Sequence, residues 1–157
     1  MGAVYAVSFS GVVLMGWWND YIRIPFCDKG RDRSGADCWG LVRLIYQEQL
    51  GIALPDYLDC YETTGDADVL GKIIREERES KWISPAIPQP FDVIIINMLG
   101  VAMHVGVVTA PGFMIHTVEG IGVIHERFDT IRMRGRVAGF ARHQCRIQPT
   151  AVQPAAQ

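Results

Sequence analysis

The sequence lacks an excess of charge of either sign. Its 157 residues include 15 Lys and Arg against 17 Asp and Glu, which gives a formal net charge of −2. Such a balance provides no electrostatic reason to bind DNA, RNA or an anionic membrane surface. We therefore expect neither a nucleic acid nor a membrane as partner. At this length, with 49% hydrophobic residues, we expect a single domain with one core.

A long apolar run with charged flanks is also missing. Residues 1–16, MGAVYAVSFSGVVLMG, are apolar and uncharged. A secretory signal needs a basic N-terminal region, and a transmembrane helix needs about 20 apolar residues. We interpret residues 1–16 as an apolar arm or strand, or as a stretch upstream of a natural start at Met15. We expect synthesis in a reducing cytoplasm without a signal peptide.

Close-spaced cysteine pairs are absent as well. The sequence has four cysteines and no CxxC motif, so we expect neither a disulfide framework nor a zinc ribbon. At least one thiol is therefore available for chemistry or for a place in the core. The four are Cys27, Cys38, Cys60 and Cys145.

Two helices are predicted in the first half of the chain. A short amphipathic segment at 17–23 ends before Pro25, because the residue before a proline leaves the helical region. The first long helix runs from Cys38 to Leu50, with Gly51 as its C-cap, and the second covers 66–80. The charged run REERE in the second helix is expected to face solvent.

Strands are predicted in the second half. Short β-branched runs alternate with turns at 111–112 and 119–122, which favours an antiparallel meander. Helices followed by strands indicate the α+β class. The domain is expected over 17–145, and the tail at 146–157 lacks periodicity and is expected to be disordered. The predicted strands are 91–96, 104–109, 113–118, 122–128 and 137–143.

The position of Cys38 suits a nucleophile. The thiolate is the reactive form of a cysteine, and its unperturbed pKa near 8.5 leaves little of it at neutral pH. A helix N-terminus lowers that pKa, since unpaired N–H groups favour negative charge, and a neighbouring imidazole lowers it further. Cys38 shares the inward face of its helix with Leu41 and Val42. The alternative is an inert core cysteine, which is the commoner role of a lone cysteine on an apolar helix face.

Two histidines are candidates for the base. If the hairpin turns about Ala110 with an odd-numbered loop, His104 and His116 lie directly opposite each other on one face, about 5 Å apart at Cβ. Gly106 on that face would leave space for a helix. Cys38, His104 and His116 would then be the nucleophile, base and orienting group of a cysteine hydrolase.

Other roles for the histidines stay open. Strand histidines are commonly structural, and a Cys-His-His zinc site is a further alternative, although no close-spaced ligand pair supports it. His125 and His143 are interpreted as surface strand residues, with His125 in reserve for the orienting role.

The string GADCWGLVRLIYQEQLGIALP, followed by PQPFDVIII, MHVGVV and FMIHTVEGIGV, resembles the NlpC/P60 family of papain-like cysteine peptidases. The resemblance runs from about Trp17 to His143 and is strongest to members carried in phage tails or prophages. It implies a papain-like α+β fold, with N-terminal helices packed on a central antiparallel sheet. By this resemblance Cys38 matches the nucleophile, His104 the general base and His116 the third residue that orients it.

The family cleaves peptide stems of bacterial peptidoglycan, typically between D-γ-glutamyl and a diamino acid. The resemblance therefore implies stem peptides as substrate, no metal and no organic cofactor. It also implies phage tail-tip proteins as possible partners and a place in the virion.

Four further residues are expected to contact substrate. Asp37 matches a position that holds the substrate's free amino terminus in several members, and a carboxylate suits an ammonium. Phe26 replaces a tyrosine that helps to stabilise the oxyanion, and Trp39 stands where many members carry a serine. Arg33, with Arg31, is a candidate for binding stem-peptide carboxylates, the alternative being solvated loop charges.

Two rival functions remain at this point. Phe26 favours a structural tail-tip module with weak or no catalysis, whereas the complete Cys-His-His set argues against it. The other rival keeps the chemistry but acts as an amidase or acyltransferase on a different amide or ester.

Overall fold

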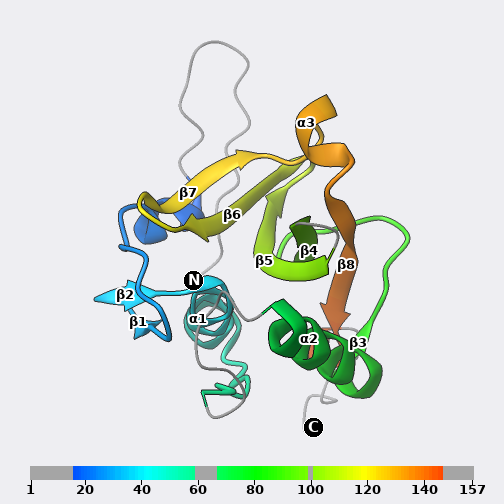
Figure 1. The fold of residues 1–157 in the computed structure, drawn as a ribbon, viewed down its shortest axis with the longest axis horizontal. Coiled ribbons are helices and arrows are strands. Elements are labelled where there is room, and N and C mark those ends of the chain that lie inside the picture. Colours follow the sequence, from blue (N-terminus) through cyan, green and yellow to red (C-terminus); the bar gives the residue numbers. More distant parts are fainter. Residues whose placement is uncertain (1–15, 59–66, 99–100, 147–157) are drawn as a thin grey trace, which may run out of the picture.

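The longer helices lie in the first half of the chain and the longer strands in the second half (Figure 1). The computed structural model describes residues 16–58, 67–98 and 101–146. The expected apolar arm, apart from Gly16, and the expected disordered tail, apart from Arg146, lie outside the described residues, as does Cys60. The predicted α+β class is confirmed.

The predicted helices and strands appear in the predicted order with small shifts at their ends, and the structure adds three two-residue strands, a short helix and a terminal 3₁₀ turn. The first half contains a 3₁₀ helix η1 (Trp17–Tyr21), strands β1 (Arg31–Asp32) and β2 (Gly35–Ala36), helix α1 (Cys38–Ile45), a π-helical turn η2 (Tyr46–Leu50) and helix α2 (Ala67–Lys81). The second half contains β3 (Trp82–Ile83), β4 (Val93–Met98), β5 (Val101–Ala110), β6 (Phe113–Val118), β7 (Gly122–Arg127), α3 (Ile131–Arg134), β8 (Val137–His143) and a 3₁₀ turn η3 (Gln144–Arg146).

A six-stranded antiparallel sheet organises the fold. Its strand order is β3-β8-β4-β5-β6-β7. Strands β4 to β7 form the predicted meander. Strand β8, however, returns to pair with the free side of β4, and β3 pairs with β8, so the meander covers only part of the sheet.

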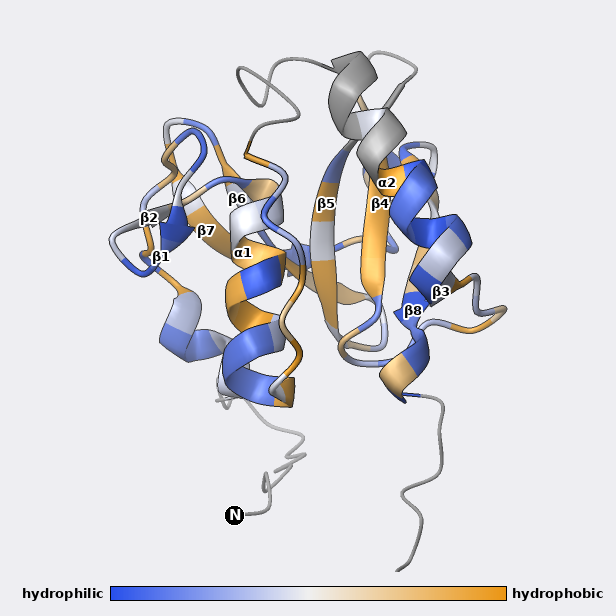
Figure 2. Cartoon of the chain, turned by 90° about the horizontal axis from the view of Figure 1, so that it is seen from below, coloured by the Kyte–Doolittle hydropathy of each residue, from blue (hydrophilic) through white to orange (hydrophobic). Residues whose placement is uncertain are grey.

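Helices α1 and α2 both pack against β5 (Figure 2). The hydrophobic stripe of α1, which includes Leu41, Val42 and Ile45, is fully buried in one cluster with Val105 and Val107 of β5. Alternation along the strands places every second residue on this helix-covered face. The sheet and the two helices therefore share the main core.

The opposite face of the sheet holds a smaller hydrophobic cluster. Ile94, Ile96, Val108 and Met114 pack there with Met133 of α3. Because His104 is paired with Ile96 in the β4–β5 register, it belongs to this second face, away from most of α1. A site that combines Cys38 with His104 therefore requires the start of α1 to reach the second face of the sheet.

The charged run of α2 is only partly solvated. Glu77 is buried, and its carboxylate accepts a hydrogen bond from the hydroxyl of Tyr57 and lies 3.6 Å from the Lys81 ammonium. The expectation that REERE faces solvent was therefore wrong for its central residue. The buried face of a helix includes polar positions beside the apolar ones when a loop packs over them, as the loop that carries Tyr57 does here.

Candidate active site

Cys38 is the first residue of α1. The helix begins there because Asp37 is its N-cap: the Asp37 carboxylate accepts a 2.7 Å hydrogen bond from the Gly40 N–H. The Cys38 side chain is buried, with 4% of the residue exposed. Backbone N–H groups of Val105 and Trp39 donate to its sulfur. These contacts hold the thiol against β5.

Strands β5 and β6 separate near the Cys38 thiol. Strand pairing between β5 and β6 is recorded from Ala110↔Phe113 to Val107↔Ile115, whereas β5 stays paired with β4 as far as Val101. Strands β6 and β7 turn away from β5 toward the other side of the molecule in Figure 1. The N-terminus of α1 lies at this divergence, so a thiol from the helix-covered side meets histidines of the second face.

His104 and His116 lie on the same face, but diagonally and not directly opposite. The pair Ala110↔Phe113 flanks a two-residue turn, and the next pair is Val108↔Met114, so Thr109 is an extra residue in β5. This β-bulge shifts the strand pairing by one residue, and because side chains alternate between faces, the shift puts both histidines on one face. The expected direct opposition was wrong because the hairpin turns at 111–112, beyond Ala110; continuing the Val107↔Ile115 pairing sets Gly106 opposite His116.

Gly106 makes room for His116 and not for a helix. A Cβ atom at Gly106 would lie 3.0 Å from the Cβ of His116 and 2.9 Å from the carbonyl oxygen of Ile115. Such contacts are too close for an alanine without movement of the neighbouring strand. The predicted role of Gly106 is therefore corrected: the glycine lets β6 lay its histidine across β5.

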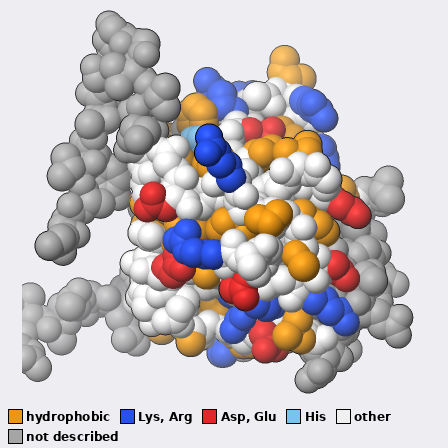
Figure 3. Space-filling model, turned by 90° about the vertical axis from the view of Figure 1, so that its left-hand side faces the viewer, with side chains coloured by type: hydrophobic (Ala, Val, Ile, Leu, Met, Phe, Trp, Pro, Cys, Tyr) orange, Lys and Arg blue, Asp and Glu red, His pale blue; other side chains and the backbone are white. Residues whose placement is uncertain are grey.

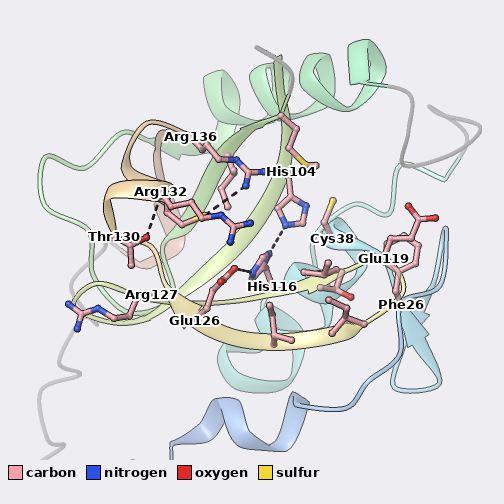
Figure 4. A pocket seen from close by; sticks show the side chains of 17 residues that line it. Phe26, Cys38, His104, His116, Glu119, Glu126, Arg127, Thr130, Arg132 and Arg136 are labelled. Atoms are coloured by element: carbon pink, nitrogen blue, oxygen red, sulfur yellow. Dashed lines mark hydrogen bonds and ion pairs between the residues drawn. The ribbon is translucent and has the colours of Figure 1, made fainter.

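A hydrogen-bonded series of side chains begins at His104, beside the thiol. Figure 4 shows the Cys38 thiol and the His104 ring pointing toward one another. His104 Nε2 lies 2.8 Å from His116 Nδ1, and His116 Nε2 lies 2.6 Å from Glu126 Oε1. The structure thus brings the three predicted catalytic residues together and adds Glu126 of β7.

Sequence reasoning missed Glu126. In the β6–β7 register His116 pairs with Ile124 and Met114 with Glu126, so Glu126 is a diagonal neighbour of His116 on the same face. The alternation along β7 indicates which residues share a face with Glu126, but its contact with His116 follows only from the register of the hairpin.

Burial keeps the thiol and the imidazole uncharged. The pKa of Cys38 is raised to about 12, chiefly by burial and also by the Asp37 carboxylate, while the N–H groups of Val105 and Trp39 act in the other direction. The pKa of His104 is lowered to about 3 by burial, by His116 and by the positive charge of Arg136. The expectation that the helix N-terminus lowers the thiol pKa is not met, because burial and the N-cap carboxylate outweigh it.

The site opens into a pocket with a volume of about 730 Å³. Phe26, Cys38, His104 and His116 lie along its wall, and the α3 side carries cationic groups. Arg127 is held by Asp129, with 2.8 Å between guanidinium and carboxylate. Among the described residues, Arg132 and Arg136 form no ion pair with a carboxylate. The charged side chains that line the pocket are the arginines Arg127, Arg132 and Arg136 and the acidic residues Glu119 and Glu126.

Asp37 does not line this pocket. It is fully buried, and its carboxylate pairs with the Arg31 guanidinium at 2.7 Å and accepts the Lys29 N–H at 3.1 Å. A carboxylate so enclosed cannot meet an ammonium of a substrate without leaving its cap. The expected substrate contact of Asp37 is therefore corrected to a structural one, which fixes the start of α1.

Of the other three predicted substrate contacts, only Phe26 lines the pocket. The indole N–H of Trp39 donates to the Pro55 carbonyl at 2.8 Å on the far side of α1, so Trp39 belongs to the core. Arg33 forms a 2.6 Å ion pair with Glu48 outside the pocket. Both expectations are wrong in this geometry: Trp39 points to another side of α1 than Cys38, and Arg33 lies in the turn between β1 and β2.

Phe26 is held beside the thiol by backbone pairing. It forms an isolated bridge with Ala36, and the neighbouring Ile24 carbonyl accepts the Val123 N–H at 2.9 Å. These bonds fasten the segment before β1 to β2 and β7. The aromatic ring consequently occupies a fixed place on the pocket wall.

The remaining histidines are structural. His125 Nε2 lies 2.7 Å from the Thr109 hydroxyl and its ring stacks on Trp18, so His125 does not orient His104. His143 is buried against Trp82, contrary to the expected surface position. Within 16–58, 67–98 and 101–146, no group of three or more His, Cys, Asp or Glu side chains is arranged to hold a metal ion.

The surface carries both signs of charge. Acidic and basic side chains are interspersed on the face shown in Figure 3. Among the described helices, none combines the length and the apolar character needed to cross a bilayer.

Comparison with known proteins gives a family match. The model of the NlpC/P60 family matches residues 24–142. No curated protein matches the chain.

Solved structures share the fold. The NlpC/P60 domain of the peptidoglycan hydrolase SagA is 22% identical with a TM-score of 0.53, over 78% of this chain and 89% of that one. An NlpC/P60 family protein from Bacillus cereus ATCC 10987 is 22% identical with a TM-score of 0.59, over 80% of this chain and 37% of that one. A lipoprotein-like NLP/P60 protein from Staphylococcus aureus subsp. aureus Mu50 is 19% identical with a TM-score of 0.55, over 79% and 38%. The chain thus spans well under half of the last two proteins.

Proposed function

Because the chain belongs to the NlpC/P60 family, we propose that it is a cysteine peptidase that hydrolyses the peptide stems of bacterial peptidoglycan. The observation that carries the proposal is the series Cys38, His104, His116 in one pocket, with His104 and His116 hydrogen-bonded at 2.8 Å. A thiol beside an oriented imidazole is the arrangement that nucleophilic acyl transfer requires.

The chemistry begins from a neutral thiol and a neutral imidazole. As the sulfur of Cys38 attacks the scissile carbonyl carbon, its proton moves to the free nitrogen of His104. His104 then returns the proton to the leaving amine, and water hydrolyses the thioester with His104 again as base. Coupling the proton transfer to the attack avoids a separate charged pair in a buried site.

The developing oxyanion needs a hydrogen-bond donor. We assign this role to the backbone N–H of Cys38 at the start of α1, where the helix dipole also favours negative charge. Phe26 lines the same region and has no group that donates. The oxyanion therefore has one hydrogen-bond donor fewer than it would have with a tyrosine at position 26.

The charges of the pocket support an anionic stem peptide. Arg132 and Arg136 lie on the α3 side, and guanidinium groups bind carboxylates in bidentate fashion. The free α-carboxylate of a γ-linked D-glutamyl residue is such a group. We accordingly propose the bond between D-γ-glutamyl and the diamino acid as the one cleaved.

The setting proposed for this activity is a phage tail, with the virion as the site of action and tail-tip proteins as partners. The support is the resemblance of segment 35–55 to tail-borne family members. A weakly active structural module is the second candidate, and Phe26 in the pocket is the observation that favours it.

Defined muropeptides test the proposal. We expect wild-type protein to release two fragments whose masses place the new carboxylate on D-glutamate and the new amine on the diamino acid. Cys38→Ala should release none, and Cys27→Ala, which alters an exposed thiol outside the pocket, should behave as wild type. Cleavage of other amides or esters alone would favour the amidase or acyltransferase alternative, and no cleavage of any substrate would favour the structural module.

A further inference from the structure

Glu126 ends the hydrogen-bonded series that runs from His104 through His116 in the pocket with Cys38. Its Oε1 lies 2.6 Å from His116 Nε2, and His116 Nδ1 lies 2.8 Å from His104 Nε2. The His116 side chain is 7% exposed, whereas that of Glu126 is 40% exposed. A carboxylate reached by solvent thus contacts a buried imidazole that contacts a second one.

The donor and acceptor inventory of these groups leaves one arrangement for neutral histidines. An ionised carboxylate only accepts, so His116 Nε2 must carry a hydrogen and donate it to Glu126. A neutral imidazole has one N–H, so His116 Nδ1 is bare and accepts the Nε2–H of His104. His104 Nδ1 is then bare as well, and it is the nitrogen left to face the thiol.

We propose that Glu126 is a positioning residue that fixes the tautomers of both histidines and thereby keeps the base nitrogen of His104 unprotonated. The inference rests on the proposed function for its kinetic consequence, but the tautomers themselves do not depend on it. Without the carboxylate, His116 can carry its proton on Nδ1 and donate to His104. The proton of His104 would then sit on Nδ1, where it blocks transfer from Cys38.

The charges around the pair favour this role. Three groups surround His116: His104 on β5, Glu126 on β7 and Arg136 in the segment between α3 and β8. Burial lowers the pKa of His116 and Arg136 acts in the same direction, whereas Glu126 raises it. When His104 takes the thiol proton, Glu126 is the negative group linked to the new positive charge through His116.

The experiment combines histidine nitrogen NMR with kinetics. In ¹⁵N-labelled wild-type protein near neutral pH, we expect His104 and His116 both as Nε2–H tautomers. Glu126→Gln should shift both toward mixed or Nδ1–H forms, because an amide can accept or donate. Its kcat/KM on a muropeptide should fall about 10²-fold, with most of the loss in kcat, which is less than the roughly 10⁴ that loss of the orienting carboxylate costs a Ser-His-Asp triad.

Two further variants separate positioning from folding. Glu119→Gln removes the other carboxylate of the pocket, which makes no recorded contact with either histidine, and should leave both tautomers unchanged. Glu126→Asp keeps the charge and should recover tautomers and kcat better than Glu126→Gln. An Nδ1–H tautomer of His104 in wild type, or unchanged tautomers in Glu126→Gln, would overturn the inference. A wild type without turnover would count against the proposed function, while the NMR result would still decide the role of Glu126.

Discussion

His104 Nε2 lies 2.8 Å from His116 Nδ1 although the two residues are not opposite each other on β5 and β6. The contact exists because Thr109 forms a bulge that restores the shared face, and because Gly106 gives the His116 side chain room to lie across β5. The backbone of the β5–β6 hairpin therefore sets the contact between the base His104 and the orienting residue His116.

Gly106→Ala should disturb this contact. The new Cβ would lie 3.0 Å from the His116 Cβ and 2.9 Å from the Ile115 carbonyl oxygen, so the hairpin must shift. Overpacking of this kind costs about 1 to 3 kcal/mol of unfolding free energy. We expect a matching loss in chemical denaturation and a lower kcat. Gly135→Ala is the control, since a Cβ there meets no atom within 4 Å; equal effects of both variants would contradict the packing argument.

Acid should destabilise the protein. The folded pKa of His104 is about 3, well below the ordinary 6.5, so between these values the unfolded chain binds a proton that the folded chain does not. Stability is therefore complete above about pH 6.5 and falls as the pH drops toward 3, by at most roughly 1.4 kcal/mol per pH unit for this residue.

Urea denaturation at successive pH values measures this effect. His104→Asn should show a smaller decrease of unfolding free energy between pH 6.5 and 4 than wild type. The slope will not vanish, because burial also lowers the pKa of His116, His125 and His143. Identical slopes for wild type and His104→Asn would show that His104 is not buried in neutral form.

Arg132→Gln should weaken binding of a carboxylate-bearing stem. If the guanidinium pairs with the α-carboxylate of the D-glutamyl residue, KM should rise several-fold for that stem and little for one in which the group is amidated. Arg134→Gln on the same helix is the matched control, because Arg134 donates to the Asp129 carbonyl and does not line the pocket. A rise in KM for both stems, or for both variants, would leave the assignment without support.

Phe26→Tyr should raise turnover if the oxyanion lacks a side-chain donor. One such donor is worth about 3 to 4 kcal/mol at most, and its placement here is untuned, so the gain is bounded at roughly 10 to 10³ in kcat. The gain must vanish when Cys38→Ala is added. A Phe26→Tyr variant no faster than wild type would mean that another group already serves the oxyanion.

The sequence allowed the main features of the site to be predicted where local physics decides them. A cap residue and an apolar stripe define α1, so Cys38 at its start follows from the pattern, as does the even spacing of His104 and His116. The diagonal contact could not be predicted, since the bulge at Thr109 depends on pairing across two strands.

Other misjudged features depended on tertiary packing. A carboxylate before a helix can serve as cap or as ligand, and only the burial of Asp37 against Arg31 decides for the cap. The pKa of Cys38 rises chiefly because the fold buries the thiol and also because of the Asp37 carboxylate, and no argument from the helix alone contains that burial. Glu126 meets His116 through the β6–β7 register, and single strands do not carry that information.

Trapping of the acyl-enzyme tests the central claim, which is that Cys38 is the nucleophile. Wild-type protein mixed with a muropeptide and quenched in acid within the first turnovers should carry the acyl fragment on the peptide that contains Cys38, as seen by mass spectrometry. Cys38→Ala should show neither adduct nor product, while Cys27→Ala should show both. Product release that persists in Cys38→Ala would contradict the account.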